Sequence, residues 1–464
     1  MRTYDDVIAA KMATPYFAGI HVSPSDIGPA LFAHQRDLVR WACRKGRAAV
    51  FADTGLGKSL IALEWARHVS ARGRVLILTP LAVAQQFVRE GIKWGIPIAY
   101  LRADDGAAPI VVTNYEMLAH FDPSAFHGVV IDESSCLKAF DGKTRNEIIA
   151  AFASTPMRLA CTATPAPNDH GELGNHSEFL GIKTRAEMLA EYFVHDGETT
   201  SEWRLKGHAR DAFWRWVASW GAVIGKPSDL GHADDGYDLP PLRMVEHVLP
   251  IDIADAHRAG ALFAAPVSTL SDQRANRRAT ASKRVAKAAD IAGDGRPCLV
   301  WCELNSEQDA IEAALGELAF SVRGSDSLDE KVASVMRWVD GERPAMISKT
   351  SIVGFGMNFQ HCARQVFLGA SHSYEQTYQA IRRSWRFGQT QPVDIHIIRA
   401  ENEGAIVANY RRKEADAQAM AAEMRKHSRA AVRSEVQGVN AKEWNEHNAW
   451  LTMDVPSWLS PEVT

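Results

Sequence analysis

The sequence predicts an α/β protein with two lobes, each built on a parallel β-sheet, and three observations carry this prediction. Short apolar runs typical of buried strands alternate with segments of helical periodicity, as in parallel sheets covered by helices. This alternation stops between about residues 196 and 242 and then resumes. The length of 464 residues is enough for two large units with appendages.

Two sets of apolar runs are expected to form the strands of the two sheets. The first set comprises 48–51, 75–78, 110–112, 129–131 and 157–160, and the second comprises 244–249, 298–301, 345–347, 366–368 and 393–398. Helical segments such as 306–318 separate them. We therefore divide the chain into a first lobe (1–195), a connector (196–242), a second lobe (243–400) and a C-terminal helix and tail (401–464).

The connector is aromatic-rich and contains a helical pattern in which Phe213, Trp216 and Trp220 share one face. A single stripe of this kind is suited to packing against a lobe rather than to stacking on bases. The long charged stretch 405–433 is expected to be a helix, and the residues after it form a packing arm or a loose tail.

Composition and charge narrow the possible classes of protein. With 46% hydrophobic and 23% charged residues, the chain is neither collagenous nor wholly disordered. Its 52 basic and 56 acidic residues give a net charge of −4, so nucleic-acid binding would depend on local clusters such as the basic residues of 274–287. The six cysteines form no C-x-x-C pair and are expected to be reduced core residues. We find no leader and no long apolar segment, and we expect a cytosolic protein.

A phosphate-binding loop is expected directly after the first strand, in the segment ADTGLGKS at 52–59. Backbone N–H groups of such a loop surround a nucleotide's phosphates, Lys58 reaches the outer phosphates, and Ser59 ligates Mg²⁺. Glycine is needed because Gly55 and Gly57 permit positive φ and leave no Cβ against the phosphates. The alternative is a chance turn before a helix. The residues expected to bind ATP here are Thr54, Gly55, Leu56, Gly57, Lys58 and Ser59.

An acidic pair, Asp132 and Glu133, follows the strand-like run 129–131. Asp132 is placed to hold hydrated Mg²⁺, and Glu133 to orient or deprotonate the attacking water of a phosphoryl transfer. Two acids after a strand are by themselves more often a solvated turn. Their position about 70 residues after the phosphate loop favours the catalytic interpretation.

Arg383 and Arg386 form the third candidate element, in the second half of the chain. Three residues apart on a helix, they could present two guanidinium groups to one γ-phosphate as arginine fingers. An isolated basic helix face is more often simply solvated. If they do act as fingers, the site is formed between the two lobes.

These motifs together resemble a superfamily-two helicase-type motor of the Swi/Snf-like branch of double-stranded DNA translocases. The small versions carried by bacteriophages and bacteria, with a DEAD/DEAH-box-like acidic motif, are the most similar. The resemblance extends over most of residues 30–400 and is carried by LFAHQ (31–35), ADTGLGKS (52–59), IDES (131–134), TATP (162–165), KTSIVGFGMNF (349–359) and QAIRRSWRFGQ (379–389).

The resemblance implies two tandem RecA-like lobes and a DNA-dependent ATP hydrolase with ATP and Mg²⁺ as cofactors. It assigns adenine recognition to Gln35, and it assigns coupling between the lobes to Thr162, Thr164, Gly356, Asn358 and Gln379. It assigns contacts with nucleic-acid phosphates to Thr79, Pro80, Gln85, Asn114, Tyr115, Lys349, Thr350 and Gln376. A helix-capping role is an equally good interpretation of Thr79 and Pro80.

The implied partner is duplex DNA bound without sequence specificity, with an unidentified targeting protein as a further possibility and no membrane. The implied location is the cytoplasm of a bacterial or phage-infected cell. The sequence departs from the family pattern at Ser134 and Ser135, where Gly-His or Ala-His is common, and at Val353 and Arg382, where a glycine is usual. The segment 371–376 also lacks the usual Asp-Trp-Asn-Pro. Two other functions stay open, a strand-separating DNA or RNA helicase and a nucleotide-switched DNA-binding clamp or recruitment module.

Overall fold

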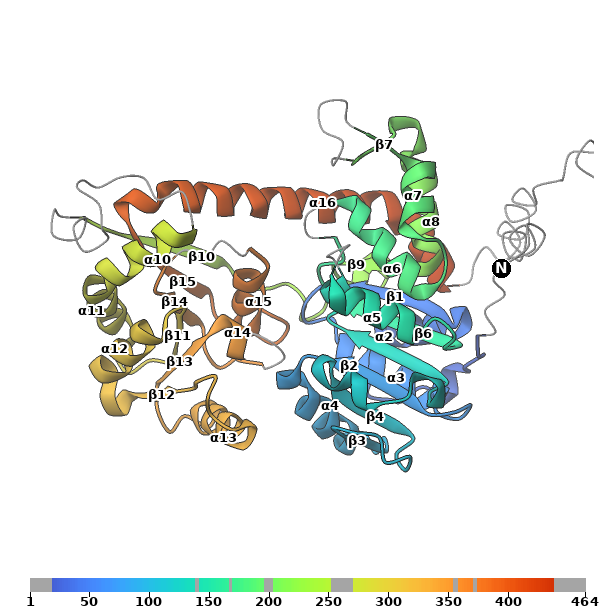
Figure 1. Cartoon of the computed structure of the whole chain (residues 1–464), viewed down its shortest axis with the longest axis horizontal. Helices are drawn as coiled ribbons and strands as arrows, with labels where there is room; N and C mark the ends of the chain where they lie inside the picture. Colours follow the sequence, from blue (N-terminus) through green and yellow to red (C-terminus); the bar gives the residue numbers. More distant parts are fainter. Residues whose placement is uncertain are drawn as a thin grey trace, which may run out of the picture.

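The computed structural model describes residues 19–137, 142–166, 169–195, 203–251, 270–353, 358–369 and 374–437. In this part, the chain forms two α/β lobes side by side, and one long helix crosses both of them (Figure 1). The main sheet of each lobe contains parallel pairings throughout. The predicted fold class, two tandem RecA-like lobes with parallel sheets, is confirmed.

The first sheet has the strand order β3-β4-β2-β5-β6-β1-β9 within the described residues. Its strands are β1 (Arg47–Ala52), β2 (Val75–Thr79), β3 (Ile98–Tyr100), β4 (Ile110–Asn114), β5 (Gly128–Asp132), β6 (Met157–Thr162) and β9 (Gly221–Ile224). Alternate residues of β2 belong to two different core clusters, with Ile77 in one and Leu78 in the other. Both faces of the sheet are therefore buried, which explains why its central strands read as unbroken apolar runs.

Helices cover the sheet of the first lobe (Figure 1). They are α2 (Ala33–Lys45), α3 (Lys58–Val69), α4 (Leu81–Lys93), α5 (Lys143–Ala151), α6 (Leu173–Leu180), α7 (Arg185–Tyr192) and α8 (Arg210–Trp220). A two-stranded antiparallel hairpin of β7 (Phe193–His195) and β8 (Trp203–Leu205) projects beyond α7 and α8.

The segment predicted as a connector contributes to the first lobe itself. Its strand β9 pairs in parallel with β1 as an edge strand of the first sheet. The aromatic stripe of α8 packs into the lobe, and Phe213 and Trp220 are fully buried there, which confirms packing over base stacking. A four-residue apolar run after an aromatic helix gives no periodic signal, so the sequence did not distinguish β9 from a linker.

The second sheet has the order β10-β15-β14-β11-β13-β12 within the described residues. Its strands are β10 (Leu242–Leu249), β11 (Cys298–Cys302), β12 (Ala319–Ser321), β13 (Ala345–Lys349), β14 (Arg364–Phe367) and β15 (Val393–Ala400). Its helices are α10 (Leu270–Ala279), α11 (Ala281–Ala292), α12 (Asn305–Leu315), α13 (Leu328–Val339), α14 (Thr350–Val353) and α15 (Tyr374–Ser384). All five strands predicted for this lobe overlap observed ones, whereas the three-residue β12 was not predicted.

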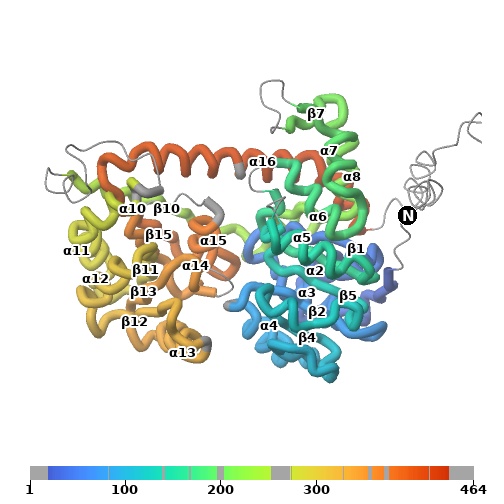
Figure 2. Tube along the Cα trace, viewed as in Figure 1, coloured from blue at the N-terminus to red at the C-terminus, as the bar shows by residue number. Residues whose placement is uncertain are grey.

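The long helix α16 (Gly404–Gln437) connects the two lobes over a length of about 50 Å (Figure 2). It begins beside the second sheet, and its C-terminal half packs on the first lobe, where Met424 and Val432 are buried in the core. Ion pairs between Arg210 and Glu423 (2.8 Å) and between Lys45 and Glu435 (2.7 Å) reinforce this contact. The predicted C-terminal helix is therefore a packed interlobe element.

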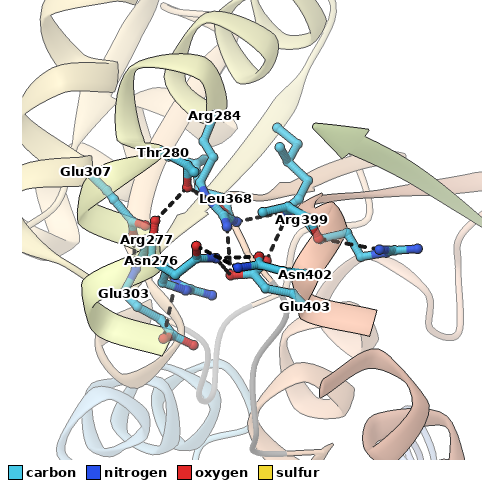
Figure 3. Close-up of polar contacts among 12 residues, drawn as sticks. Asn276, Arg277, Thr280, Arg284, Glu303, Glu307, Leu368, Arg399, Asn402 and Glu403 are labelled. Carbon is cyan, nitrogen blue, oxygen red and sulfur yellow. Dashed lines mark hydrogen bonds and ion pairs between the residues drawn. The ribbon is translucent and has the colours of Figure 1, made fainter. Parts of the chain in front are cut away.

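A buried polar network fixes the start of α16 to the second lobe (Figure 3). The Arg284 guanidinium pairs with Glu403 at 2.7 Å, and both side chains are fully buried. Arg284 also donates to the backbone oxygens of Leu368 and Ile398, each at 3.0 Å. Nearby, Arg277 pairs with Glu303 at 3.1 Å and is itself buried.

This network removes two basic residues of the segment 274–287 from the surface, where either a solvated helix face or a nucleic-acid-binding cluster would need them. Arg277 and Arg284 point into the lobe and are used for structure, because a buried guanidinium needs carboxylate and carbonyl partners. Among this segment's basic residues in the described structure, Arg274 and Arg278 are exposed, and Lys283 and Lys287 are half-buried. The sequence showed a helical basic pattern but not which residues the lobe would bury.

The cysteines behave as expected. All six are free, and Cys136 is half-buried while the other five are buried. Among the described residues, no helix combines the length and the apolar character needed to cross a membrane.

We predict that Arg284→Met lowers the free energy of unfolding by about 3–5 kcal/mol, because it leaves the Glu403 carboxylate buried without a counter-charge. Chemical denaturation followed by circular dichroism measures this. Arg296→Met is the matched control, since Arg296 forms an exposed pair with Asp294, and it should cost less than about 1 kcal/mol. Equal costs for the two variants would contradict the structural role assigned to Arg284.

Candidate active site

The loop between β1 and α3 has the backbone shape of a phosphate-binding loop. Gly55 and Gly57 adopt left-handed φ values of 95° and 83°. A Cβ on Gly57 would lie 2.2 Å from Gln35 Nε2, so the loop tolerates only glycine there. The Lys58 ammonium donates to the backbone oxygen of Ala52 at 2.9 Å, and burial lowers its pKa. Ser59 follows in the first turn of α3.

Gln35 supports this loop directly. Its Oε1 accepts from the backbone N–H of Phe32 at 3.0 Å, and its Nε2 donates to the backbone oxygen of Leu56 at 3.1 Å. Both ends of the amide are thus used within the protein, and the side chain is buried. Adenine recognition by Gln35 stays a prediction, whereas a loop-supporting role is directly visible.

The acidic pair lies at the end of β5, beside the phosphate loop. Burial raises the pKa of the Asp132 carboxyl to about 7, and the charge of Glu133 adds to this, while Thr79, Lys58 and Arg383 oppose it. Glu133 has a left-handed φ of 57°, unusual for a residue with a side chain, and its Oε2 is buried without a hydrogen-bond partner in the described structure. Strain and an unsatisfied carboxylate at one residue are typical of a functional position.

Two residues expected to contact nucleic acid, Thr79 and Tyr115, bond to Asp132 in this structure, and their contact with nucleic acid stays a prediction. The Thr79 hydroxyl, at the end of β2, donates to Asp132 Oδ2 at 3.0 Å and is fully buried. The Tyr115 hydroxyl, directly after β4, donates to the backbone oxygen of Asp132. Of the two residues in the capping alternative, Pro80 occupies the N-cap position of α4, and Thr79 is the last residue of β2.

The second lobe presents Arg383 to this site from the end of α15, whereas Arg386 lies two residues beyond the helix, so the expectation that both share one helix face is wrong. Arg383 is buried, and it lies close enough to Glu133 and Asp132 for their charges to raise its pKa, against a larger lowering by burial. Arg386 donates instead to Asn358 Oδ1. Burial and the charges of Arg383 and Arg382 lower its pKa to about 9. The structure thus brings Arg383 to the acidic pair and directs Arg386 toward Asn358.

The expected coupling residues lie around these groups. Thr162 is buried at the end of β6, and its Oγ1 accepts from the backbone N–H of Thr164 at 3.1 Å. Gln379 is buried on α15, and its Oε1 has no hydrogen-bond partner in the described structure. Asn358 bonds to Arg386 as above, and Gly356 lies outside the described residues.

A cleft of about 280 Å³ separates α4 of the first lobe from α13 of the second. One wall is polar and contains Gln85, Arg89 and Lys93, and the other is apolar and contains Val335 and Met336. Asn358 also lines it, so the cleft adjoins the arginine end of the site. Gln85 is the expected nucleic-acid contact that lies in this cleft.

The remaining expected contacts have varied surroundings. Pro80 is half-buried at the start of α4, and Thr350 is half-buried at the start of α14. Asn114 is buried and bonds to Tyr100 and Glu116. Lys349 donates to Asn305 Oδ1 at 2.6 Å, and Gln376 is exposed on α15.

Comparison with solved structures found similar chains. The SWI2/SNF2 ATPase core of Sulfolobus solfataricus in complex with double-stranded DNA is similar at a TM-score of 0.40 and 15% identity, covering 82% of this chain and 90% of that chain. The chain matches no family model and no curated protein. The site is therefore assigned from its own geometry.

Sequence reasoning did not identify several residues at this interface. Asp53, within the phosphate loop, bonds to Tyr378 and Arg382 of the second lobe. Phe387 packs on Tyr237 and Phe32, with ring centroids 4.6 and 5.7 Å apart. The sequence did contain one signal for this contact. Asp53 is a carboxylate inside an expected phosphate-binding loop, and such a carboxylate requires a nearby cation.

We predict that Gly57→Ala destabilises the first lobe by about 2–4 kcal/mol, since it combines left-handed strain with a collision against Gln35. Thermal denaturation provides the measurement. Gly106→Ala is the matched control, because Gly106 has a similar φ of 72° but open space around it, and it should cost about 1 kcal/mol. If both variants lose the same stability, the contact with Gln35 has no energetic role.

Proposed function

We propose that this chain is an ATP-dependent motor that hydrolyses ATP and tracks along duplex DNA by contacts with phosphates. The observation that supports it best is the arrangement of Lys58, the acidic pair and Arg383 around one point between the lobes. A phosphate-binding lysine, a metal-binding carboxylate, a base and a cation from the facing lobe are the groups that phosphoryl transfer requires.

ATP and Mg²⁺ fit the donor groups present at this point. Ser59 and Asp132 offer a hydroxyl and a carboxylate oxygen, the ligand types that Mg²⁺ prefers. The described residues contain no cluster of three or more His, Cys, Asp or Glu side chains that could hold a metal. The nucleotide's phosphates and water would therefore complete the coordination. Bound Mg²⁺ would neutralise charge on the outer phosphates.

The protein's own groups divide the remaining work. The unpartnered Glu133 Oε2 is available to accept a proton from an attacking water. Arg383 stabilises the charge that develops on the transferred phosphoryl group. Since Arg383 belongs to the second lobe, hydrolysis depends on how the two lobes are placed relative to each other.

The polar wall of the α4–α13 cleft is our candidate for contact with the nucleic-acid strand. Gln85, Arg89 and Lys93 supply amide and cationic donors, which suit phosphate oxygens and carry no base information. The choice of duplex DNA rests on the resemblance of the sequence motifs. Thr79 and Tyr115 both bond to Asp132, and Thr79 lies two residues before the start of α4. A nucleic-acid strand bound along α4 could therefore influence Asp132.

We predict that duplex DNA stimulates ATP hydrolysis more than single strands or RNA do, as measured by phosphate release in a coupled assay. Lys58→Ala should lose ATP binding and turnover, and Glu133→Gln should bind ATP without hydrolysing it, because only the base is removed. Triplex displacement and fork unwinding on the same samples separate translocation from strand separation. Strong stimulation by RNA without any by duplex DNA would contradict the proposal, and turnover without displacement would favour the clamp.

We predict that Arg383→Ala slows turnover about a thousandfold or more with little change in ATP affinity, since its charge is needed mainly in the transition state. Single-turnover hydrolysis and nucleotide titration measure the two effects separately. Arg323→Ala is the control, because Arg323 pairs with Asp309 and Glu312 inside the second lobe. Retained turnover in a double Arg383→Ala, Arg386→Ala variant would exclude the finger assignment.

A further inference from the structure

The phosphate loop is joined to the second lobe by a pair of charged side chains. Asp53 lies in the loop, and its Oδ2 is 2.6 Å from Arg382 Nη2 on α15. Its Oδ1 accepts from the Tyr378 hydroxyl at 2.7 Å and from the backbone N–H of Thr54 at 2.6 Å. Both carboxylate oxygens of Asp53 therefore have donors. Two of the three donors, Arg382 and Tyr378, belong to the second lobe.

The surroundings hold Arg382 in this position. It is 5% exposed, and its guanidinium lies 5.0 Å from the centre of the Trp385 ring and 5.6 Å from that of Tyr378. Trp385 is fixed in turn, because its indole N–H donates to the backbone oxygen of Pro240 at 2.7 Å. The last turn of α15 thus rests on the phosphate loop and on the chain segment between the lobes.

Charge gives this pair a specific role at an anion-binding loop. A carboxylate next to bound phosphates repels them unless a cation compensates it. Burial alone would raise the pKa of Asp53, but the charge of Arg382 and the hydrogen bonds from Tyr378, Arg382 and Thr54 hold it below its ordinary value. Asp53 is therefore ionised, and Arg382 supplies the compensating charge.

Geometry gives the pair a second role, because Arg382 and Arg383 are consecutive. Neighbouring residues on a helix point about 100° apart. With Arg382 held by Asp53, the rotation of α15 about its axis is fixed, and Arg383 is directed toward Glu133 and Asp132. Loss of the first contact would release the second.

We propose that Asp53 and Arg382, assisted by Tyr378, form an interlobe latch that keeps the phosphate loop electrically compensated and positions Arg383 at the acidic pair. The two members are positioning residues. This inference rests on the proposed ATP hydrolysis for its catalytic consequence, whereas the contact itself is independent of any activity.

Steady-state ATP hydrolysis with duplex DNA tests the two roles separately. Arg382→Gln leaves the Asp53 charge uncompensated and releases α15, so we expect KM for ATP to rise about tenfold and kcat to fall about 10–100-fold. In the double Asp53→Asn, Arg382→Gln variant, KM should return to near the wild-type value while kcat stays low. A KM that does not recover, or an unchanged kcat, would overturn the proposal.

Arg364→Gln is the matched control for these kinetics. Arg364 is similarly buried and forms a 2.6 Å pair with Asp294, but it lies within the second lobe on β14. A general loss of stability in the second lobe would lower activity in this variant as well. We expect its KM and kcat to stay within about threefold of wild type.

Hydrogen exchange of the full chain without nucleotide tests the latch apart from activity. In Arg382→Gln, peptides covering the phosphate loop and those covering α15 should both exchange faster, whereas in Arg364→Gln neither should. Unchanged exchange of both sets of peptides in Arg382→Gln would overturn the latch, even if the wild-type protein hydrolysed ATP normally. If wild-type protein failed to hydrolyse ATP with any nucleic acid, the proposed function and the positioning of Arg383 for catalysis would both be contradicted. The hydrogen-exchange result would still show whether the Asp53–Arg382 contact joins the two lobes.

Discussion

The placement of two adjacent carboxylates, the buried Asp132 at the end of β5 and the half-buried Glu133 directly after it, is the constraint on which the rest of the site depends. Burial and the charge of Glu133 raise the pKa of the Asp132 carboxyl, so nearby cations are needed to stabilise its charged form. One compensating cation, Lys58, comes from the phosphate loop of the same lobe, and another, Arg383, comes from the facing lobe. The charges at the end of one strand therefore favour a relative placement of the two lobes in which Arg383 lies near Asp132, although these residues are far apart in the sequence.

The contacts that join the lobes in the described structure differ in physical character. Near the site, the Asp53–Arg382 pair depends on charge and on close geometry. At the other end, α16 is held on the first lobe mainly by buried apolar groups such as Val432 and on the second lobe by the Glu403–Arg284 pair.

The sequence predicted well what depends on local pattern and poorly what depends on tertiary pairing. Buried strands and the glycines of the phosphate loop are local, so the two sheets and the loop were predicted correctly. Whether Arg284 faces solvent or Glu403 depends on a contact 119 residues distant, and helical spacing contains no such information. For the same reason the sequence did not show that the Thr79 hydroxyl donates to Asp132 on the neighbouring strand β5.

Strand order explains how Asp132 is connected over a short path to the start of α4, which lines the interlobe cleft. In a parallel sheet the carboxyl ends of all strands lie at one edge, and here β2 lies between β4 and β5. Thr79 and Tyr115, which follow from β2 and β4, therefore reach Asp132 at the end of β5 by single hydrogen bonds. The helix α4 begins two residues after Thr79 and forms the polar wall of the interlobe cleft. A strand that displaced α4 would act on Asp132 through one hydroxyl group, with no longer relay required.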